Sequence, residues 1–510
     1  MTYLVNITFL ISVIIFCYFF RNKNGLPTNW PLVGMLPALF QNFHRINEFF
    51  NEIMEKSSEL TFLFKGPWFS NMNIIITVDP SNFHMCLARA SFVNYVKGPK
   101  FNEIFEFLGD GIFNSDFSLW QYHRRLAHSF FGHPKFNSIF MMKIWEEMKS
   151  RLIPLLDNVS KHGVEINLHN IFKRFSYDNV CNIILDYDPK FLSLDLAPIP
   201  LFQAVIDVEE VIFRRHAMPT SMWKFLRWLG VGEEKYQKDC QMLYDFTNKV
   251  IAMKREERKL GNPKEESEVI FHDLLTIYLN DVENPTTPIN SSNCDNFLKD
   301  AILNLLIAGG DTIGVTLSWL FYLLTKNPLV TNKIREELNV VMVKRDDENN
   351  NDDFLRKFTK HKNELVYLHG AICETLRLYP SVPFNHKNSV ESDILPSGHR
   401  MKPDMQILFN MYAQGRMKSI WGDDCYEFKP ERWITERGNI KFEPSYKFSA
   451  FGAGPRICQG KDMALTQIKI VAAAIIRRYD IEVVQGHQVV PGVSLKLQMK
   501  HGFKVKLIRC

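Results

Sequence analysis

The chain has 510 residues, of which 46% are hydrophobic and 23% are charged, and its formal net charge is +5. This composition indicates a globular protein with a large core and excludes a disordered chain, and the scattered basic residues make nucleic acid an unexpected partner. The nine cysteines are widely spaced and form no Cys-x-x-Cys pair, which argues against a disulfide framework or structural zinc and favours a reducing compartment.

The N-terminal segment has the features of a membrane anchor. Residues 3–20 carry no charge and are long enough to cross a bilayer, and Arg21 and Lys23 follow at once. Because no basic residue precedes this stretch, the positive-inside rule leaves the N-terminus outside the cytosol and the rest of the chain in it. We therefore predict a retained anchor at 1–20. A cleaved signal peptide is the alternative, and bulky residues at 16–20, where small ones would mark a cleavage site, argue against it.

The rest of the chain predicts a mainly α fold with a minor β region. Prolines and glycines at 21–40 predict a stiff hinge, followed by one domain at 41–510. Polar breaks occur at 281–295 and 344–363, and the second predicts a solvated loop. Amphipathic helical runs are predicted at 136–157, 235–259, 296–326, 365–378 and 461–479, and β-rich runs at 60–65, 74–78 and 493–507.

The middle of the run at 296–326 reads Ala308-Gly309-Gly310-Asp311-Thr312. Each glycine in a helix interior costs about 1 kcal/mol relative to alanine, so this pair predicts a need for space against one helix face. An acid beside a hydroxyl at a weakened helical turn is suited to proton delivery, which makes Asp311 and Thr312 candidate catalytic residues. The alternative is a kink or a helix–helix contact.

Near the C-terminus, the stretch Phe451-Gly452-Ala453-Gly454-Pro455-Arg456-Ile457-Cys458-Gln459-Gly460 precedes a predicted helix. A thiolate at Cys458 would lie at the positive end of that helix dipole, and the glycines would allow a flat partner to approach the backbone. Arg456 supplies a fixed cation nearby. This combination suits an iron porphyrin with carboxylate arms. The alternative is a structural cysteine in a Gly-rich turn.

This stretch matches the Phe-x-x-Gly-x-Arg-x-Cys-x-Gly signature of the cytochrome P450 superfamily, and the chain from about residue 25 onward resembles a haem-thiolate monooxygenase. The resemblance implies the mainly helical fold of that family, haem as the cofactor and Cys458 as the axial ligand of its iron. It also implies that Thr312 hydrogen-bonds dioxygen and that Asp311 relays protons from solvent. Many family members carry a hydroxyl residue after the threonine, whereas this chain has Ile313.

Two further motifs follow the family pattern. Glu374 and Arg377 resemble the Glu-x-x-Arg pair, which Arg432 would join in a structural triad that locks the cysteine loop. On a surface helix, an ion pair between residues three positions apart would contribute little to stability. Trp120 and Arg124 resemble the Trp-x-x-x-Arg motif that reaches a haem propionate.

The resemblance also implies further propionate contacts and a redox partner. Arg456 and Lys387 are expected to hold propionates, with His386 as an alternative to Lys387. No flavin or nicotinamide segment is evident, so the electrons would come from an NADPH-dependent flavoprotein reductase. That partner would dock near the cysteine side, where Lys447, Lys461 and Arg125 contribute positive charge. The enzyme would be a single-pass protein of the endoplasmic reticulum membrane with its catalytic domain in the cytosol.

Strings such as Gly109-Asp110-Gly111-Ile112-Phe113-Asn114 and Trp421-Gly422-Asp423-Asp424 resemble the plant clan of fatty-acid omega-hydroxylases and mid-chain alkane hydroxylases. The expected substrate is therefore a long-chain alkane, a fatty acid or a derivative. One alternative is oxidation or oxidative coupling of a phenolic or alkaloid metabolite, and another is a non-catalytic haem-binding protein. Thr312 argues against an oxygen-independent rearranging enzyme. Substrate contacts are expected at 101–113, 201–231, 304–308, 382–384 and 491–494.

Overall fold

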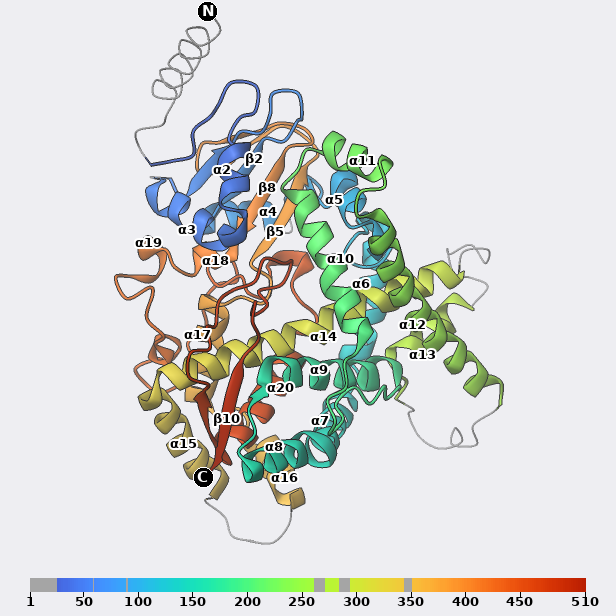
Figure 1. The fold of residues 1–510 in the computed structure, drawn as a ribbon, viewed down its shortest axis with the longest axis vertical. Helices are drawn as coiled ribbons and strands as arrows, with labels where there is room; N and C mark the ends of the chain where they lie inside the picture. Colours follow the sequence, from blue (N-terminus) through green and yellow to red (C-terminus); the bar gives the residue numbers. More distant parts are fainter. Residues whose placement is uncertain (1–24, 58, 89, 261–270, 284–293, 344–350) are drawn as a thin grey trace, which may run out of the picture.

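The computed structural model describes residues 25–57, 59–88, 90–260, 271–283, 294–343 and 351–510, and the predicted anchor at 1–20 lies outside them. The described chain is mainly helical with small sheets, which confirms the predicted fold class (Figure 1). Its α-helices are α2 (Leu36–Gln41), α3 (Ile46–Lys56), α4 (Pro80–Leu87), α5 (Gly98–Ile104), α6 (Phe117–Phe131), α7 (Phe136–Glu147), α8 (Ile153–His162), α9 (Leu168–Leu185), α10 (Pro200–His216), α11 (Thr220–Trp228), α12 (Glu233–Lys259), α13 (Leu274–Val282), α14 (Cys294–Lys326), α15 (Pro328–Val343), α16 (Asn351–His361), α17 (Val366–Leu378), α18 (Met411–Gln414), α19 (Lys418–Trp421) and α20 (Lys461–Ile476). Single helical turns are η1 (Phe43–Arg45), η2 (Glu106–Leu108), η3 (Met148–Leu152), η5 (Pro430–Trp433) and η6 (Gly454–Arg456).

The largest sheet has the strand order β1-β2-β8-β5-β3 and lies at the upper end of the molecule in Figure 1. Its second strand, Ile74-Ile75-Ile76-Thr77, is β-branched throughout, which suits a strand that is packed on both faces. That strand pairs antiparallel with β1 and parallel with β8, and the remaining pairs are antiparallel. The other sheets have the orders β4-β10-β9 and β6-β7. The strands are β1 (Thr61–Phe64), β2 (Ile74–Thr77), β3 (Tyr95–Val96), β4 (Ile166–Asn167), β5 (Phe384–Ser389), β6 (Asp393–Ile394), β7 (Arg400–Met401), β8 (Gln406–Asn410), β9 (Tyr479–Val483) and β10 (Lys504–Arg509).

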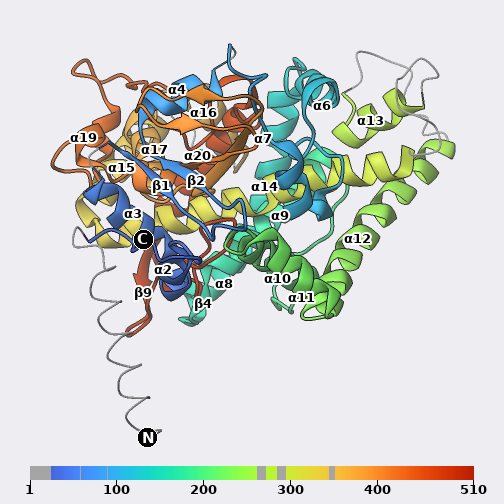
Figure 2. The same ribbon diagram turned by 90° about the horizontal axis from the view of Figure 1, so that it is seen from above.

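Helix α14 runs through the middle of the molecule in both ribbon views, and it packs against α9, α12, α17 and α20 (Figure 1, Figure 2). Its side chains are apolar on nearly every face, which is the pattern of a helix enclosed by protein. Among the described residues it is also the one helix long and apolar enough to span a membrane, but 89% of its apolar window is buried inside the protein. It is therefore a core helix.

The two glycines of α14 make room for a neighbouring helix. A Cβ atom added at Gly309 would collide with the Val180 side chain, and one added at Gly310 would collide with the ring of Tyr177. Both partners lie on α9. The space predicted from the glycine pair thus serves a close helix–helix contact, and this contact sets the position of the segment that carries Asp311 and Thr312.

Two predicted elements differ from the observed ones. The solvated loop predicted at 344–363 contains α16, because Phe354 and Phe358 lie one helical turn apart and are both buried, Phe354 stacking on Trp145 at 4.8 Å. The β-rich run predicted at 493–507 is a strand only from Lys504. Before that, the backbone carbonyl of Leu497 accepts a hydrogen bond from the Trp319 indole rather than from a strand.

The structure adds detail to two other predictions. The helix predicted at 136–157 is α7 followed by the π-helical turn η3 and by α8, so it extends to His162. The range predicted as a hinge at 21–40 ends inside α2. Pro37 is compatible with this helix because it stands in the first turn, where a missing backbone N–H is tolerated.

We predict that Gly310→Ala lowers the free energy of unfolding by about 1 to 3 kcal/mol, because the new methyl group must displace the Tyr177 ring. Helix propensity alone would stabilise this variant. Urea denaturation followed by circular dichroism measures the change. The double variant Gly310→Ala/Tyr177→Leu should recover part of the loss, and an increase in stability for the single variant would contradict the close contact.

Candidate active site

A cavity of about 550 Å³ lies between α5, α10, α14, β5, β8 and the loop that carries Cys458. Most of its wall is apolar and aromatic, with contributions from Phe101, Phe105, Ile307, Ala308, Phe384 and Leu408. Six of the predicted site residues line this cavity: Trp120, Arg124, Thr312, Lys387, Arg456 and Cys458. Asp311, Glu374, Arg377 and Arg432 do not line it.

The cysteine loop is held by its backbone. The Cys458 amide donates a hydrogen bond to the Phe451 carbonyl at 2.8 Å, and Gly452 and Gly454 have left-handed φ angles of 70° and 65°. Gly454 packs so tightly against the Leu87 carbonyl that any Cβ would collide with it. At least this glycine is therefore required by packing against α4. The cysteine follows in a fixed position on the cavity wall.

The Cys458 thiol is accessible, but the surface that it exposes faces the cavity. Burial raises its pKa, although the Gly460 backbone N–H and the nearby Arg124 and Lys461 charges oppose this. The predicted preference for thiolate at the start of α20 is thus outweighed by burial. A bound metal ion would reverse the balance, because coordination displaces the thiol proton.

Arginine side chains occupy the wall near this thiol. Arg456 donates to Asp116 at 2.6 Å and to the Ser115 carbonyl at 2.7 Å, and its guanidinium lies 4.9 Å from the Trp120 ring. Its Nε is buried, and no residue in the described part of the chain is its hydrogen-bond partner. Burial lowers the Arg456 pKa to about 10. Arg124 donates a hydrogen bond to the Ile457 carbonyl at 2.6 Å, which ties α6 to the cysteine loop. Both arginines also line the cavity.

Two buried lysines complete a cluster of basic side chains. The Lys387 amine is buried and has no hydrogen-bond partner among the described residues, and burial together with the Arg456 charge holds its pKa well below the usual range. Lys97, which the sequence analysis missed, donates to Asn385 at 3.1 Å, and burial and Arg456 lower its pKa to about 7. Its position before Gly98-Pro99 gives no local signal of function. Asp116 is the acid that contacts this cluster, so the wall is short of negative charge.

Thr312 and Asp311 are adjacent in α14 but face different surroundings. The Thr312 hydroxyl donates to the Ala308 carbonyl at 2.7 Å and lies on the cavity wall. The Asp311 carboxylate is buried between Lys173, at 3.1 Å, and Lys496, at 2.8 Å. Burial would raise its pKa, but the two ammonium groups overcome burial and hold it below the usual range. The structure therefore does not bring Asp311 into the cavity, and it adds two lysines that the sequence analysis missed.

The amino-acid sequence is similar to known proteins of one family. The family model for Cytochrome P450 matches residues 25–507. The chain belongs to the cytochrome P450 family. It is 39% identical to an alkane hydroxylase, MAH1, of Arabidopsis thaliana over 99% of this chain and 98% of that protein. It is 40% identical to cytochrome P450 86B1 of the same plant, over 96% and 86%, and 37% identical to noroxomaritidine synthase 1 of Narcissus pseudonarcissus, over 95% and 92%.

The protein is thus a cytochrome P450 monooxygenase whose cofactor is haem, as the sequence predicted. The residues of the cavity fit this group. Cys458 would ligate its iron. The buried Lys387 amine and the Arg456 Nε, which have no hydrogen-bond partner within the ranges that the structure describes, would bind its two carboxylates. When bound, the haem supplies the oxygen-activating chemistry, which a thiolate ligand promotes. Trp120, Arg124 and Lys97 line the same wall.

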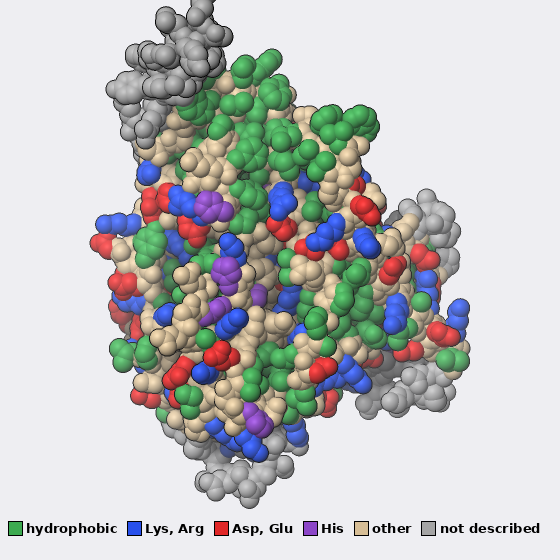
Figure 3. Space-filling view, viewed as in Figure 1, with side chains coloured by type: hydrophobic (Ala, Val, Ile, Leu, Met, Phe, Trp, Pro, Cys, Tyr) green, Lys and Arg blue, Asp and Glu red, His purple; other side chains and the backbone are tan. Residues whose placement is uncertain are grey.

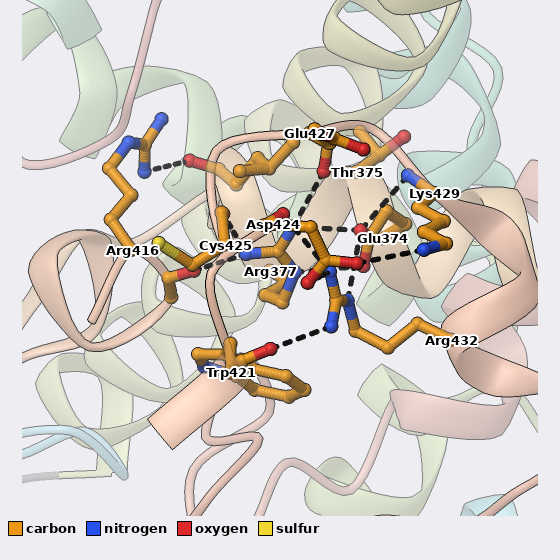
Figure 4. Close-up of polar contacts among 12 residues, drawn as sticks. Glu374, Thr375, Arg377, Arg416, Trp421, Asp424, Cys425, Glu427, Lys429 and Arg432 are labelled. Atoms are coloured by element: carbon orange, nitrogen blue, oxygen red, sulfur yellow. Dashed lines mark hydrogen bonds and ion pairs between the residues drawn. The ribbon is translucent and has the colours of Figure 1, made fainter. Parts of the chain in front are cut away.

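The Glu374 carboxylate is fully buried and is the centre of a polar cluster on α17 and the segment that follows β8 (Figure 4). Arg377 donates to it twice, at 2.7 and 2.8 Å, and Arg432 approaches it at 3.4 Å. The Trp433 indole adds a donor at 2.8 Å. Arg377 also donates to the carbonyls of Gly415, Cys425 and Glu427. The three predicted residues therefore lie together, away from the cavity.

We predict that Glu374→Gln lowers the free energy of unfolding of the P450 by about 3 to 5 kcal/mol, because it leaves the buried Arg377 cation without its counter-charge. Trp433→Phe is the matched control. It removes one donor from the same carboxylate and should cost about 1 kcal/mol. Chemical denaturation and the haem content of purified protein measure both changes. Equal losses for the two variants would contradict a dominant role of the ion pair.

The buried lysines predict a pH dependence for the haem-free protein. Lys97 has a folded pKa of about 7 and an ordinary value of 10.5, so between these values the unfolded chain binds a proton that the folded chain does not. Stability should therefore rise from pH 7 to pH 10.5, by at most about 1.4 kcal/mol per pH unit for this group. Lys97→Met should reduce that slope in denaturation curves. The surface variant Lys65→Met is the control, and an unchanged slope in Lys97→Met would contradict the assignment.

Proposed function

We propose that this P450 hydroxylates a long-chain apolar substrate, an alkane, a fatty acid or a derivative. The observation that carries the proposal is that the Cys458 thiol and the Thr312 hydroxyl face one apolar cavity. The overall reaction inserts one atom of dioxygen into a carbon–hydrogen bond and releases the other as water, consuming two electrons and two protons that NADPH and a proton supply. The electrons would arrive through a flavoprotein reductase.

The cavity wall supports an apolar substrate. Four of the five ranges expected to contact substrate supply lining residues, and in the fifth the lining begins later, at Leu495 and Lys496. Burying each methylene group is worth about 0.8 kcal/mol, so such a wall can discriminate alkyl chains by length. The relative named as an alkane hydroxylase supports this substrate class.

A second candidate is oxidation or oxidative coupling of a phenolic or alkaloid metabolite. The relative named noroxomaritidine synthase 1 favours it. The cavity also carries a polar pair, His216 and His386, whose Nε2 atoms lie 3.1 Å apart. Burial holds the pKa of both rings below the usual range, so the pair is neutral and offers hydrogen bonds rather than charge.

Exposed apolar residues support an association with membrane lipid. They include Leu32 and Phe40, next to or within α2, Trp68 and Phe69 between β1 and β2, and Phe225 and Trp228 on α11. These segments lie at the upper end of the molecule, where hydrophobic side chains gather in the space-filling view (Figure 1, Figure 3). We propose that this end rests on the endoplasmic reticulum membrane, with an anchor at 1–20, a hinge at 21–40 and the catalytic domain, 41–510, in the cytosol.

The cavity residues have separate proposed roles. Cys458 would ligate the haem iron, and Arg456, Trp120, Arg124 and Lys387 would hold the haem propionates. Thr312 holds a proton at its hydroxyl on the cavity wall. The reductase is proposed to dock on the cysteine side, where Arg125, Lys447 and Lys461 contribute positive charge. The triad of Glu374, Arg377 and Arg432 is structural.

The function is tested with purified protein, reductase and NADPH. Spectral titrations with palmitic acid, a long-chain alkane and a phenolic amine identify the substrate class, and product analysis under dioxygen then identifies the reaction. Palmitic acid or the alkane is expected to bind and to be hydroxylated. Haem binding without a product from any substrate class would favour a non-catalytic haem protein. A Cys458→Ser variant whose carbon monoxide spectrum equals the parent's would exclude the thiolate ligand.

We predict that Thr312→Ala retains haem but diverts electrons from product to peroxide and water, because the cavity loses the hydroxyl that holds a proton. Typical losses on removing one proton-handling group are about 100-fold or more in product rate. NADPH consumption, peroxide and product are measured together. Unchanged coupling of NADPH to product would contradict the role of Thr312.

A further inference from the structure

Four charged side chains form a buried cluster beside the cavity, which we name the buried ion cluster: Lys173, Glu209, Asp311 and Lys496. They come from α9, α10, α14 and the segment before β10, and none is more than 6% exposed. Their formal charges cancel. Taking four charges out of water is unfavourable, so an arrangement of this kind is retained only where mutual attraction compensates for the lost hydration.

Lys496 is the shared member of this cluster. Its ammonium lies 2.6 Å from a Glu209 oxygen and 2.8 Å from an Asp311 oxygen. Lys173 lies 3.1 Å from the other Asp311 oxygen, Ser494 donates to Glu209 at 3.2 Å, and the Tyr177 hydroxyl donates to Asp311 at 3.3 Å. One cation thus bridges two acids on different helices.

The cluster has a cavity side and a far side. Glu209 and Lys496 line the cavity together with Thr312, whereas Asp311 and Lys173 do not line it. Asp311 is therefore separated from the cavity by its bond to Lys496. For this carboxylate to take up a proton and pass it toward Thr312, its attraction to that ammonium must weaken.

Glu209 is placed to weaken the attraction between Asp311 and the Lys496 ammonium. When Glu209 is ionised, it competes with Asp311 for the Lys496 ammonium, and when it is neutral the ammonium belongs to Asp311. Burial raises the Glu209 pKa, against the effect of Lys496. The charge of Glu209 thus controls how tightly Lys496 holds the Asp311 carboxylate.

We propose that Glu209 and Lys496 are positioning residues for the proton supply of the oxidation, with the shared Lys496 ammonium setting how readily Asp311 accepts and passes on a proton. This inference rests on the proposed monooxygenase function. It predicts opposite effects for the two members of one ion pair, because removing the Glu209 charge tightens the hold on Asp311 whereas removing the Lys496 charge loosens it.

The experiment compares Glu209→Gln and Lys496→Met in the haem-loaded protein with reductase, NADPH and palmitic acid. In Glu209→Gln the product rate should fall by about tenfold, the scale of a lost charged hydrogen bond, with more peroxide and a larger solvent isotope effect in D₂O. In Lys496→Met the isotope effect should fall below that of the parent. Asp311→Asn serves as the reference for lost proton supply.

Ser494→Ala is the matched control, since it removes the hydroxyl that donates to Glu209 and leaves every charge in place. It should change the product rate by less than about twofold. If Lys496→Met does not retain haem, Glu209→Gln is compared with Glu209→Asp instead. This variant restores the charge and should recover the product rate relative to Glu209→Gln.

The outcomes distinguish a failure of the positioning role from a failure of the proposed monooxygenase function. A parent protein that has the thiolate carbon monoxide spectrum and forms product, but whose Glu209→Gln variant has an unchanged isotope effect, overturns the positioning role alone. Isotope effects that move in the same direction in Glu209→Gln and Lys496→Met, together with lower thermal stability, show that the cluster is only structural. A parent without product overturns the proposed function itself.

Discussion

The fully buried Glu374 carboxylate connects the helical core to the loop that presents the cysteine. Its ion pair with Arg377 places a guanidinium where it donates to three backbone carbonyls of the segment between β8 and η5. The Trp433 indole bonds to the same carboxylate, and its ring packs against Phe448 at 4.5 Å, three residues before Phe451. One charge pair thus ties α17 to the segment that leads from β8 to the cysteine loop. Because a buried unpaired charge is strongly unfavourable, each partner depends on the other.

The cavity has different electrostatics at its two ends. Around Cys458, the basic side chains Lys97, Arg124, Lys387 and Arg456 outnumber the acid among the described residues that contacts them, Asp116, and an anionic cofactor would stabilise their charged forms. Along α14, the buried ion cluster is neutral as a whole. Between them the wall is aromatic and aliphatic. The first end is suited to binding a fixed group, and the second to moving a proton without a change in net charge.

Residues within local motifs could be predicted from the sequence, and residues that act only through the tertiary structure could not. Cys458 and Thr312 stand in short strings whose spacing already fixes which side chains are neighbours, and both lie on the cavity wall. Lys97, Lys173 and Lys496 are single lysines in three unrelated segments. No sequence pattern indicates that they are buried, because the side chains that they bond to or pair with, Asn385, Asp311 and Glu209, are 138 or more positions away along the chain. The error at α16 has a related cause: the acidic, Asn-rich composition before it concealed two aromatic residues at helical spacing.

Asp311 and Thr312 are consecutive in a helix, so their side chains leave its axis about 100° apart. Two lysines hold the first side chain on one side, and this fixes the angle at which the second is presented on the other. The charged residues on α9 and before β10 therefore prevent α14 from rolling about its long axis. A change at Lys173, which does not line the cavity, would reorient the threonine hydroxyl without altering any atom of the cavity wall.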